Sequence, residues 1–297
     1  MQGLIIENIS NLYKIKAKKG IYEANARGKF KKEEITPVVG DKVEIQILDK
    51  ENKKAVIEEI QDRTTYIKRP KMSNITQLVL VVSSKNPKPD LLLLDKQLAF
   101  AEFLGIKAII VLNKTDLDKK KEFEKIKEVY QNIGYTVIET IAKEQENNLS
   151  GIQELKKYLK GNINAFSGNS GVGKSTLINA IFKDTITQEG EISQRNKKGK
   201  NTTTSTKLYE IDENTYIADT PGFSTFDISE IEYKELDKYF KEFKPLVANC
   251  EFVGCTHIKE ENCGIKQALQ LGKIDSGRYE RFCKIYEELK EKEKYKW

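Results

Sequence analysis

A single phosphate-binding motif constrains the fold of this chain more than any other feature. It fits G-x-x-x-x-G-K-[ST] and reads Gly168-Asn169-Ser170-Gly171-Val172-Gly173-Lys174-Ser175-Thr176. An apolar run over residues 163–166 predicts a strand before it, and residues 176–182 predict a helix after it. Glycines let the loop turn its N–H groups inward, and a helix N-terminus adds partial positive charge. This context favours a nucleotide-binding P-loop over a Gly/Ser-rich surface turn, with Lys174 on the β- and γ-phosphates and Ser175 on Mg²⁺.

Two further motifs indicate which nucleotide is bound. Asp219-Thr220-Pro221-Gly222 follows a predicted strand, where the Asp would hold Mg²⁺ through water and the Gly222 N–H would face the γ-phosphate. Asn113-Lys114-Thr115-Asp116 follows another strand. The Asp carboxylate can accept hydrogen bonds from N1–H and the exocyclic amine of guanine, a donor pair that adenine lacks. Such a site rejects the wrong base by roughly 2–5 kcal/mol, so the three motifs favour GTP and disfavour an ATP-dependent nucleic-acid enzyme.

The order of these motifs is unusual. Asp116 precedes Gly168, whereas in ordinary small GTPases the guanine motif follows the D-x-x-G motif. The sequence therefore predicts a circularly permuted GTPase domain. We expect Thr203 or Thr204, together with Lys174, to stabilise the charge that develops during hydrolysis to GDP and phosphate. Phe223 stands where many GTPases keep a water-orienting Gln, which predicts slow turnover until a partner completes the site.

Three domains are predicted along the 297 residues. Residues 1–64 contain five short apolar segments separated by turns and indicate an OB-type β-barrel. After a polar linker over residues 61–74, strands and helices alternate, which predicts a parallel sheet covered on both faces in an α/β GTPase domain over residues 65–226. Residues 227–297, which hold all four cysteines and the single histidine of the chain, predict a mostly helical zinc-binding domain, beginning with a helix over residues 229–243.

The barrel segment is rich in basic residues, and the net charge is +6. Tyr13, Tyr22 and Phe30 are candidates for stacking on nucleic-acid bases. The sequence supports equally the alternative that these side chains belong to the core. The candidate phosphate contacts are Lys14, Lys16, Lys18, Lys19, Arg27, Lys29, Lys31 and Lys32. The sequence leaves RNA binding by this segment open.

A cluster of cysteines and the single histidine suggests a metal site. Cys250-x4-Cys255-x-His257-x5-Cys263 supplies three thiolates and one imidazole, the donor set of a closed, structural Zn²⁺ site. Cys283 stands apart, among apolar helical neighbours, and is predicted to be a core residue. The apolar runs are too short to span a bilayer, and the N-terminus lacks the features of a signal peptide. We therefore expect a cytoplasmic protein without membrane contact.

With these motifs the whole chain resembles the bacterial small ribosomal subunit biogenesis GTPases, the RsgA or YjeQ family. The resemblance implies a monomer with slow GTP hydrolysis stimulated by the small (30S) subunit, contact with 16S rRNA, a role in late subunit maturation beside other late factors, and one zinc ion per chain. It places Ala142 and Lys143 at the guanine base, although Ile141 replaces a common Ser, and Asn201 replaces a common His. The alternative is a zinc-containing RNA-binding module that uses GTP only as a structural ligand.

Overall fold

The computed structural model describes residues 1–32, 35–119, 121–141, 151–189, 206–219 and 228–294. The chain forms two compact units, each assembled from three separate segments. Unit one comprises residues 1–78, 153–166 and 177–224, and unit two comprises residues 79–152, 167–176 and 225–297. The units thus divide the chain through strand β8 (Gln77–Ser83) and strand β11 (Ile163–Ser167).

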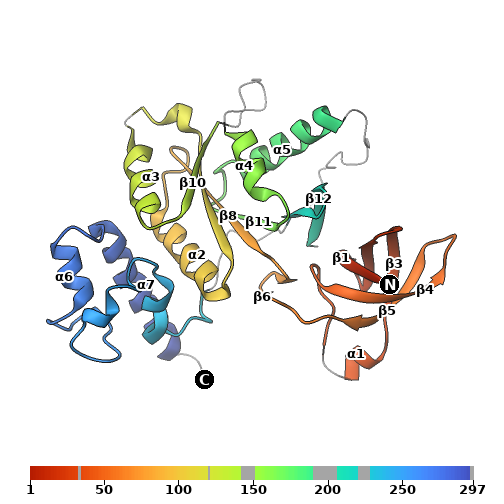
Figure 1. The fold of residues 1–297 in the computed structure, drawn as a ribbon, viewed down its shortest axis with the longest axis horizontal. Coiled ribbons are helices and arrows are strands. Elements are labelled where there is room, and N and C mark those ends of the chain that lie inside the picture. The colour runs from red at the N-terminus through yellow and green to blue at the C-terminus, as the bar shows by residue number, and fades with distance from the viewer. Residues whose placement is uncertain (33–34, 120, 142–150, 190–205, 220–227, 295–297) are drawn as a thin grey trace. The chain divides into compact units, whose positions relative to one another are not determined.

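The N-terminal part of unit one is a closed five-stranded barrel, which confirms the predicted OB-type architecture (Figure 1). The strand order is β1-β2-β3-β5-β4, and pairing of β1 with β4 closes the barrel. Buried and exposed residues alternate along most strands, as expected where one face of a sheet meets the core. The elements are β1 (Gln2–Ile9), β2 (Leu12–Ala17), β3 (Gly20–Ala26), helix α1 (Lys29–Lys32), β4 (Lys42–Asp49) and β5 (Lys54–Ile60).

The candidate stacking aromatics are core residues. Tyr13, Tyr22 and Phe30 are only 1%, 4% and 5% exposed, so the prediction that they stack on bases is wrong. Tyr13 and Tyr22 occupy inward positions of β2 and β3, and a period of two does not distinguish an inward aromatic from an exposed one. Among the candidate phosphate contacts, Lys14 pairs with Glu7 at 2.8 Å, which offsets its positive charge.

The segment predicted as a polar linker is partly ordered as a hairpin. Strands β6 (Tyr66–Lys68) and β7 (Lys71–Ser73) pair antiparallel. The hairpin is tied to the barrel by Asp41, whose fully buried carboxylate accepts hydrogen bonds from Arg63 Nε at 2.7 Å, Arg63 Nη2 at 2.8 Å and Ser73 Oγ at 2.6 Å. Polar residues of this segment form ion pairs and hydrogen bonds with a buried carboxylate, which its composition alone does not reveal.

Unit one also contains β11, β12 (Lys207–Asp212), β13 (Thr215–Asp219) and most of helices α4 (Ile152–Leu159) and α5 (Lys174–Glu189). β11 and β13 pair in parallel. β12 and β13, however, form an antiparallel hairpin, and β12 pairs with β1 of the barrel at Glu7 and Lys207. The expectation of an all-parallel sheet is therefore wrong at this edge, because the short connection between β12 and β13 allows only an antiparallel turn.

Unit two contains β8, β9 (Lys107–Asn113) and β10 (Thr136–Thr140) as neighbouring strands. All seven residues of β8 are buried, as expected for a strand covered on both faces. Helix α2 (Leu91–Leu104) contacts β9, and α3 (Glu122–Asn132) contacts β10. The segment predicted as a helix over residues 229–243 is instead a 3₁₀ helix, η3 (Tyr233–Tyr239).

The C-terminal part of unit two is helical, as predicted. It contains η3, η4 (Val247–Asn249), α6 (Gly264–Gln270) and α7 (Ser276–Lys294), shown in blue tones in Figure 1. Helix α7 packs against α2 and η3. Of the helices that the structure describes, none combines the length and apolar character needed to traverse a lipid bilayer.

Candidate nucleotide site and metal site

The P-loop lies between the end of β11 and the start of α5, in the strand–loop–helix context that its sequence predicts. Two of its glycines are required by close contacts. Gly168 has a φ of +137°, and a Cβ there would lie 2.2 Å from the Val81 carbonyl oxygen of β8. Gly173 has a φ of +100°, and a Cβ there would lie 2.3 Å from Asn113 Nδ2. The loop is therefore seated directly against its neighbours in unit two.

The Asn113–Asp116 segment meets the P-loop although 51 residues separate Asp116 from Gly168 along the chain in the reverse of the usual order. Asn113 Nδ2 donates to the Val172 carbonyl at 2.9 Å, and its Oδ1 accepts from Thr140 Oγ1 at 3.0 Å. Lys114 Nζ donates to the Gly171 carbonyl at 2.7 Å and to the Asn86 carbonyl at 2.6 Å. The two motifs thus form one continuous structure at the carboxyl ends of β9 and β11, where ligands bind in open α/β sheets.

Lys174 begins α5 and directs its amine back over the loop. Its Nζ donates to the carbonyls of Gly168 at 2.6 Å and Asn169 at 2.9 Å. Partial burial lowers the pKa of Lys174. Ser175 and Asp116 are exposed and accessible to a ligand from solvent. An ammonium group held in this way, at the N-terminus of a helix, could supply positive charge to a polyphosphate.

Two residues that sequence reasoning missed, the N-cap of α2 and a residue in its second turn, also contact the P-loop region. Asp90 Oδ2 accepts from Asn169 Nδ2 at 2.9 Å, and Gln97 Nε2 donates to Ser167 Oγ at 2.8 Å. Asp90 directly precedes the apolar run 91–94, which is a helix N-cap pattern that the sequence does contain. No local pattern marks Gln97, because its partner lies 70 residues away.

The remaining predicted site residues are not all described. Ala142, Lys143, Thr203, Thr204 and Gly222 lie outside the described residues, as does Phe223. Asp219 is the last residue of β13, and its side chain is likewise outside the described part of the chain. Thr115 and Asp116 form the start of a short 3₁₀ helix, η1 (Thr115–Leu117).

The four predicted metal ligands come together in the C-terminal part of unit two. The Sγ atoms of Cys250, Cys255 and Cys263 and a ring nitrogen of His257 all lie within 4.8 Å of one another. His257 Nδ1 is 3.6 Å from Cys250 Sγ and 3.3 Å from Cys263 Sγ, and these two sulfurs are 4.0 Å apart. Thiolate and imidazole donors at this spacing suit a tetrahedral metal ion.

Surrounding groups orient these donors. His257 is fully buried and has a φ of +63°. Its carbonyl accepts from the Tyr279 hydroxyl at 2.7 Å, and its Nε2 lies 3.5 Å from Asp237 Oδ2. The Gly264 N–H donates to Cys250 Sγ at 3.3 Å. Burial raises the pKa of Cys255 to about 12, so that thiol is neutral unless a cation offsets the charge of its thiolate.

Comparisons with known proteins agree with these features. A model of the RsgA GTPase matches residues 60–229, and a model of the RsgA N-terminal domain matches residues 2–57. The small ribosomal subunit biogenesis GTPase RsgA of Clostridium novyi is 41% identical over 297 residues, with 100% of both chains covered. The protein of the same name from Ruminiclostridium cellulolyticum is 39% identical over 296 residues, covering 99% of this chain and 95% of that one.

Solved structures show the same fold. The crystal structure of YjeQ from Thermotoga maritima matches with a TM-score of 0.83 and 35% identity, covering 97% of this chain and 98% of that one. The structure of YloQ, described as a circularly permuted GTPase, matches with a TM-score of 0.80 and 32% identity over 98% of this chain and 95% of that one. Two family models, full-length relatives and the permuted motif order lead to one assignment: the chain belongs to the RsgA GTPase family.

Proposed function

We propose that this GTPase binds GTP where the P-loop meets the Asn113–Asp116 segment, and that it hydrolyses GTP while assisting late maturation of the small (30S) ribosomal subunit. The observation that carries the proposal is the pair of side chains, Asn113 and Lys114, bonded to the P-loop carbonyls of Val172 and Gly171. The name of the relatives, small ribosomal subunit biogenesis GTPase, supports the subunit as the partner.

In this site each motif has a separate task. The Asp116 carboxylate accepts two hydrogen bonds from guanine, and Ala142 and Lys143 are the residues that would contact the base from the other side. The backbone of the P-loop surrounds the phosphates, and the Lys174 ammonium contacts the β- and γ-phosphates. Ser175 and Asp219 are the residues that would hold Mg²⁺, which supplies charge neutralisation between the phosphates when bound.

Hydrolysis is an in-line attack of water on the γ-phosphate. Lys174, with Thr203 or Thr204, would stabilise the charge that develops on the transferred group, and the Gly222 N–H would face the γ-phosphate, so that this loop senses hydrolysis. The phenyl ring of Phe223 cannot orient the attacking water. The isolated protein is therefore slow, and the small subunit completes the site.

The metal cluster fits Zn²⁺ in a structural role. Zn–S bonds of about 2.3 Å and Zn–N bonds of about 2.0–2.1 Å place neighbouring tetrahedral ligand atoms roughly 3.5–3.8 Å apart, close to the 3.3 to 4.0 Å between Cys250, His257 and Cys263. With three thiolates and one imidazole, no coordination position remains for a catalytic water. The ion would stabilise this helical module in addition to its apolar core, in which Phe240, Phe243 and Phe282 pack together.

The proposed organisation has three parts. Residues 1–64 form the barrel domain, residues 65–226 the permuted GTPase domain and residues 227–297 the zinc domain. The barrel and zinc domains contact 16S rRNA in a subunit-bound monomer, alongside other late factors, while the GTPase domain switches between them. The basic side chains of the barrel rather than its aromatic rings would make the rRNA contacts, because Tyr13 and Tyr22 are buried.

The test is the GTPase rate of the full chain against added small subunits. We expect slow release of phosphate from GTP alone, a large stimulation by 30S particles, and loss of both in Ser175→Ala. ATP should neither be hydrolysed nor compete. Bound GTP without phosphate release, with or without subunits, would instead favour a module that uses GTP only as a structural ligand.

A further inference from the structure

Helix α2 holds the beginning of the P-loop through its first two turns. Asp90 uses both carboxylate oxygens: Oδ1 caps the helix by accepting from the Leu93 N–H at 2.9 Å, and Oδ2 accepts from Asn169 Nδ2 at 2.9 Å. Gln97, only 2% exposed, donates to Ser167 at 2.8 Å. These partners lie on either side of Gly168, so the position of α2 and the position of the loop are linked from both sides.

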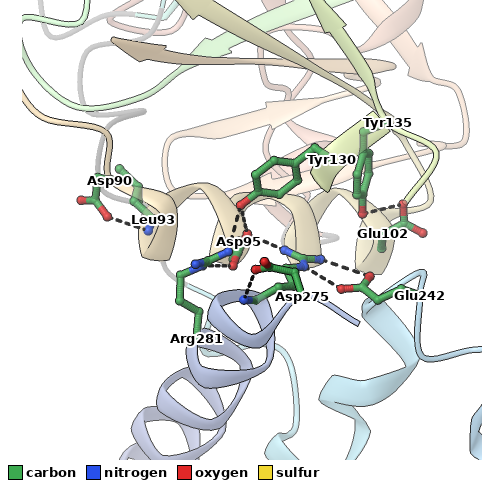
Figure 2. Close-up of polar contacts among 10 residues, drawn as sticks. Asp90, Leu93, Asp95, Glu102, Tyr130, Tyr135, Glu242, Asp275 and Arg281 are labelled. Carbon is green, nitrogen blue, oxygen red and sulfur yellow. Dashed lines mark hydrogen bonds and ion pairs between the residues drawn. The ribbon is translucent and has the colours of Figure 1, made fainter. Parts of the chain in front are cut away.

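The same helix is clamped to the C-terminal helices by a buried carboxylate. Asp95 is fully buried and accepts hydrogen bonds from Tyr130 Oη and Arg281 Nε, each at 2.5 Å (Figure 2). It also accepts a hydrogen bond from Arg278 Nη1 at 2.5 Å. Burial raises the pKa of Tyr130 well above its ordinary value, so its hydroxyl stays protonated and donates to Asp95. Tyr130 belongs to α3, and both arginines belong to α7.

The positive and negative charges of this cluster balance, which stabilises a single arrangement of its side chains. Arg278 is fully buried and also donates from Nε to Glu242 Oε1 at 2.7 Å, so the cluster contains two cations and two carboxylates. Displacing α2 from α7 would separate buried charges, which is far more costly than separating exposed ones. Further along α2, Lys96 Nζ contacts Glu288 of α7 at 2.5 Å. The clamp therefore leaves α2 little freedom to slide or rotate against α7.

We infer that α2 acts as a strut through which the C-terminal helices position the P-loop, and that Asp95, Arg281 and Asp90 are positioning residues for nucleotide binding. This inference rests on the proposed function, because it assumes that the P-loop holds GDP or GTP. Asp95 and Gln97 lie on α2 and Asp90 is its N-cap, so a shift at Asp95 moves the side chains that bond Ser167 and Asn169 with it. The link runs from Arg281 of α7 to Asp95, along the backbone of α2 to its N-cap Asp90, and from Asp90 to Asn169.

Linkage makes the effect reciprocal. If the α7 contact favours the P-loop conformation that binds nucleotide, bound nucleotide must favour the α7 contact by the same free energy. A partner that pulls on the C-terminal helices would thereby alter the release of nucleotide without touching the site. The coupling arises because α2 carries Asp95, which contacts α7, and has as its N-cap Asp90, which contacts the P-loop.

The test measures dissociation of fluorescently labelled GDP from the full chain in a double-mutant cycle. Arg281→Met removes one cation from Asp95. Asp90→Asn keeps a side-chain oxygen for the helix cap, since Asn caps as well as Asp, but leaves no second oxygen to accept from Asn169. Arg63→Met is the matched control, because it breaks a similar contact to the fully buried Asp41 in unit one.

We expect Arg281→Met and Asp90→Asn each to accelerate GDP dissociation roughly five- to fifty-fold, and the double variant to be no faster than the faster single one. Arg281→Lys, which retains the charge, should fall between wild type and Arg281→Met, whereas Arg63→Met should match wild type. The inference is overturned if Arg281→Met behaves like Arg63→Met, or if the two effects multiply. Absence of GDP binding by the wild type would refute the proposed function itself.

Discussion

Replacement of Arg278 by methionine tests how the C-terminal helices are held to α2. Arg278 is fully buried, with its guanidinium between the carboxylates of Asp95 and Glu242 and over the ring of Phe240 at 4.2 Å. Methionine fills much of the same volume and keeps the packing on Phe240. The substitution therefore removes the cation and leaves the apolar contacts largely in place.

The expected loss follows from the charges that remain. After Arg278→Met, Asp95 retains Arg281 and Tyr130, but Glu242, whose side chain is 10% exposed, loses its buried partner. Breaking one side of a buried ion pair typically costs about 3–5 kcal/mol. Lys238, paired with Glu235 at 2.6 Å on the surface, provides the contrast: both side chains are largely exposed, so Lys238→Ala should leave stability unchanged.

Hydrogen exchange followed by mass spectrometry is the appropriate assay, because it resolves α2 and α7 from the rest of the chain. A loss of about 3–5 kcal/mol corresponds to roughly a 100- to 5,000-fold faster exchange of amides that open with this contact. Peptides from the barrel should be unaffected. A loss below about 1 kcal/mol, the range of exposed pairs, would show that the cluster contributes no more than a surface contact and would refute the reasoning.

Three further predictions concern the two sites. Gly168→Ala should abolish GDP binding in a titration, because its Cβ would overlap the Val81 carbonyl, whereas Gly134→Ala, with a similar positive φ and open space, should bind normally. Chelation should release one zinc ion per chain, detected with a chromogenic indicator, and increase hydrogen exchange in α6 and α7, with Cys283→Ser releasing the same amount. Because burial holds the pKa of Lys174 below the ordinary 10.5 and a bound phosphate raises it, nucleotide binding should make Lys174 take up protons in the alkaline range just below pH 10.5. Calorimetry in buffers of different ionisation enthalpy measures how many protons are taken up. Net release of protons in this alkaline range would contradict the assignment of Lys174 to the phosphates.

Sequence patterns predicted the features that depend on residues close together along the chain. The P-loop, the Asn113–Asp116 segment and the four metal ligands are short motifs, and the structure brings together the described members of each. The bounds of α2 are likewise set by local signals, because Asp90 caps its first turn and Gly105 ends it in the left-handed conformation. Asp90 and Gly105 adjoin the two helix ends that they define, so the sequence around each end is enough to locate it.

Contacts between distant segments were not predictable in this way. Arg278 and Asp95 are 183 residues apart, and in isolation each reads as an ordinary exposed charge on an amphipathic helix. The stacking prediction for Tyr13 failed for a related reason, since the closure of β1 on β4 decides which face of β2 is the core. The 3₁₀ geometry of η3 likewise reflects its packing between α2 and α7 rather than its own helical propensity.

The contacts of Asn113 give the guanine motif a second task, on the phosphate side of the site. Its amide bonds the Val172 carbonyl, and the same amide nitrogen occupies the space that any Cβ at position 173 would need. The neighbouring Lys114 holds the Gly171 carbonyl. Because these bonds reach backbone atoms, they constrain the path of the P-loop whatever side chains it carries. Asn113 and Lys114 therefore support the conformation of the proposed phosphate-binding loop without any ligand, and the permuted chain order leaves this support intact because it depends only on where β9 and β11 end.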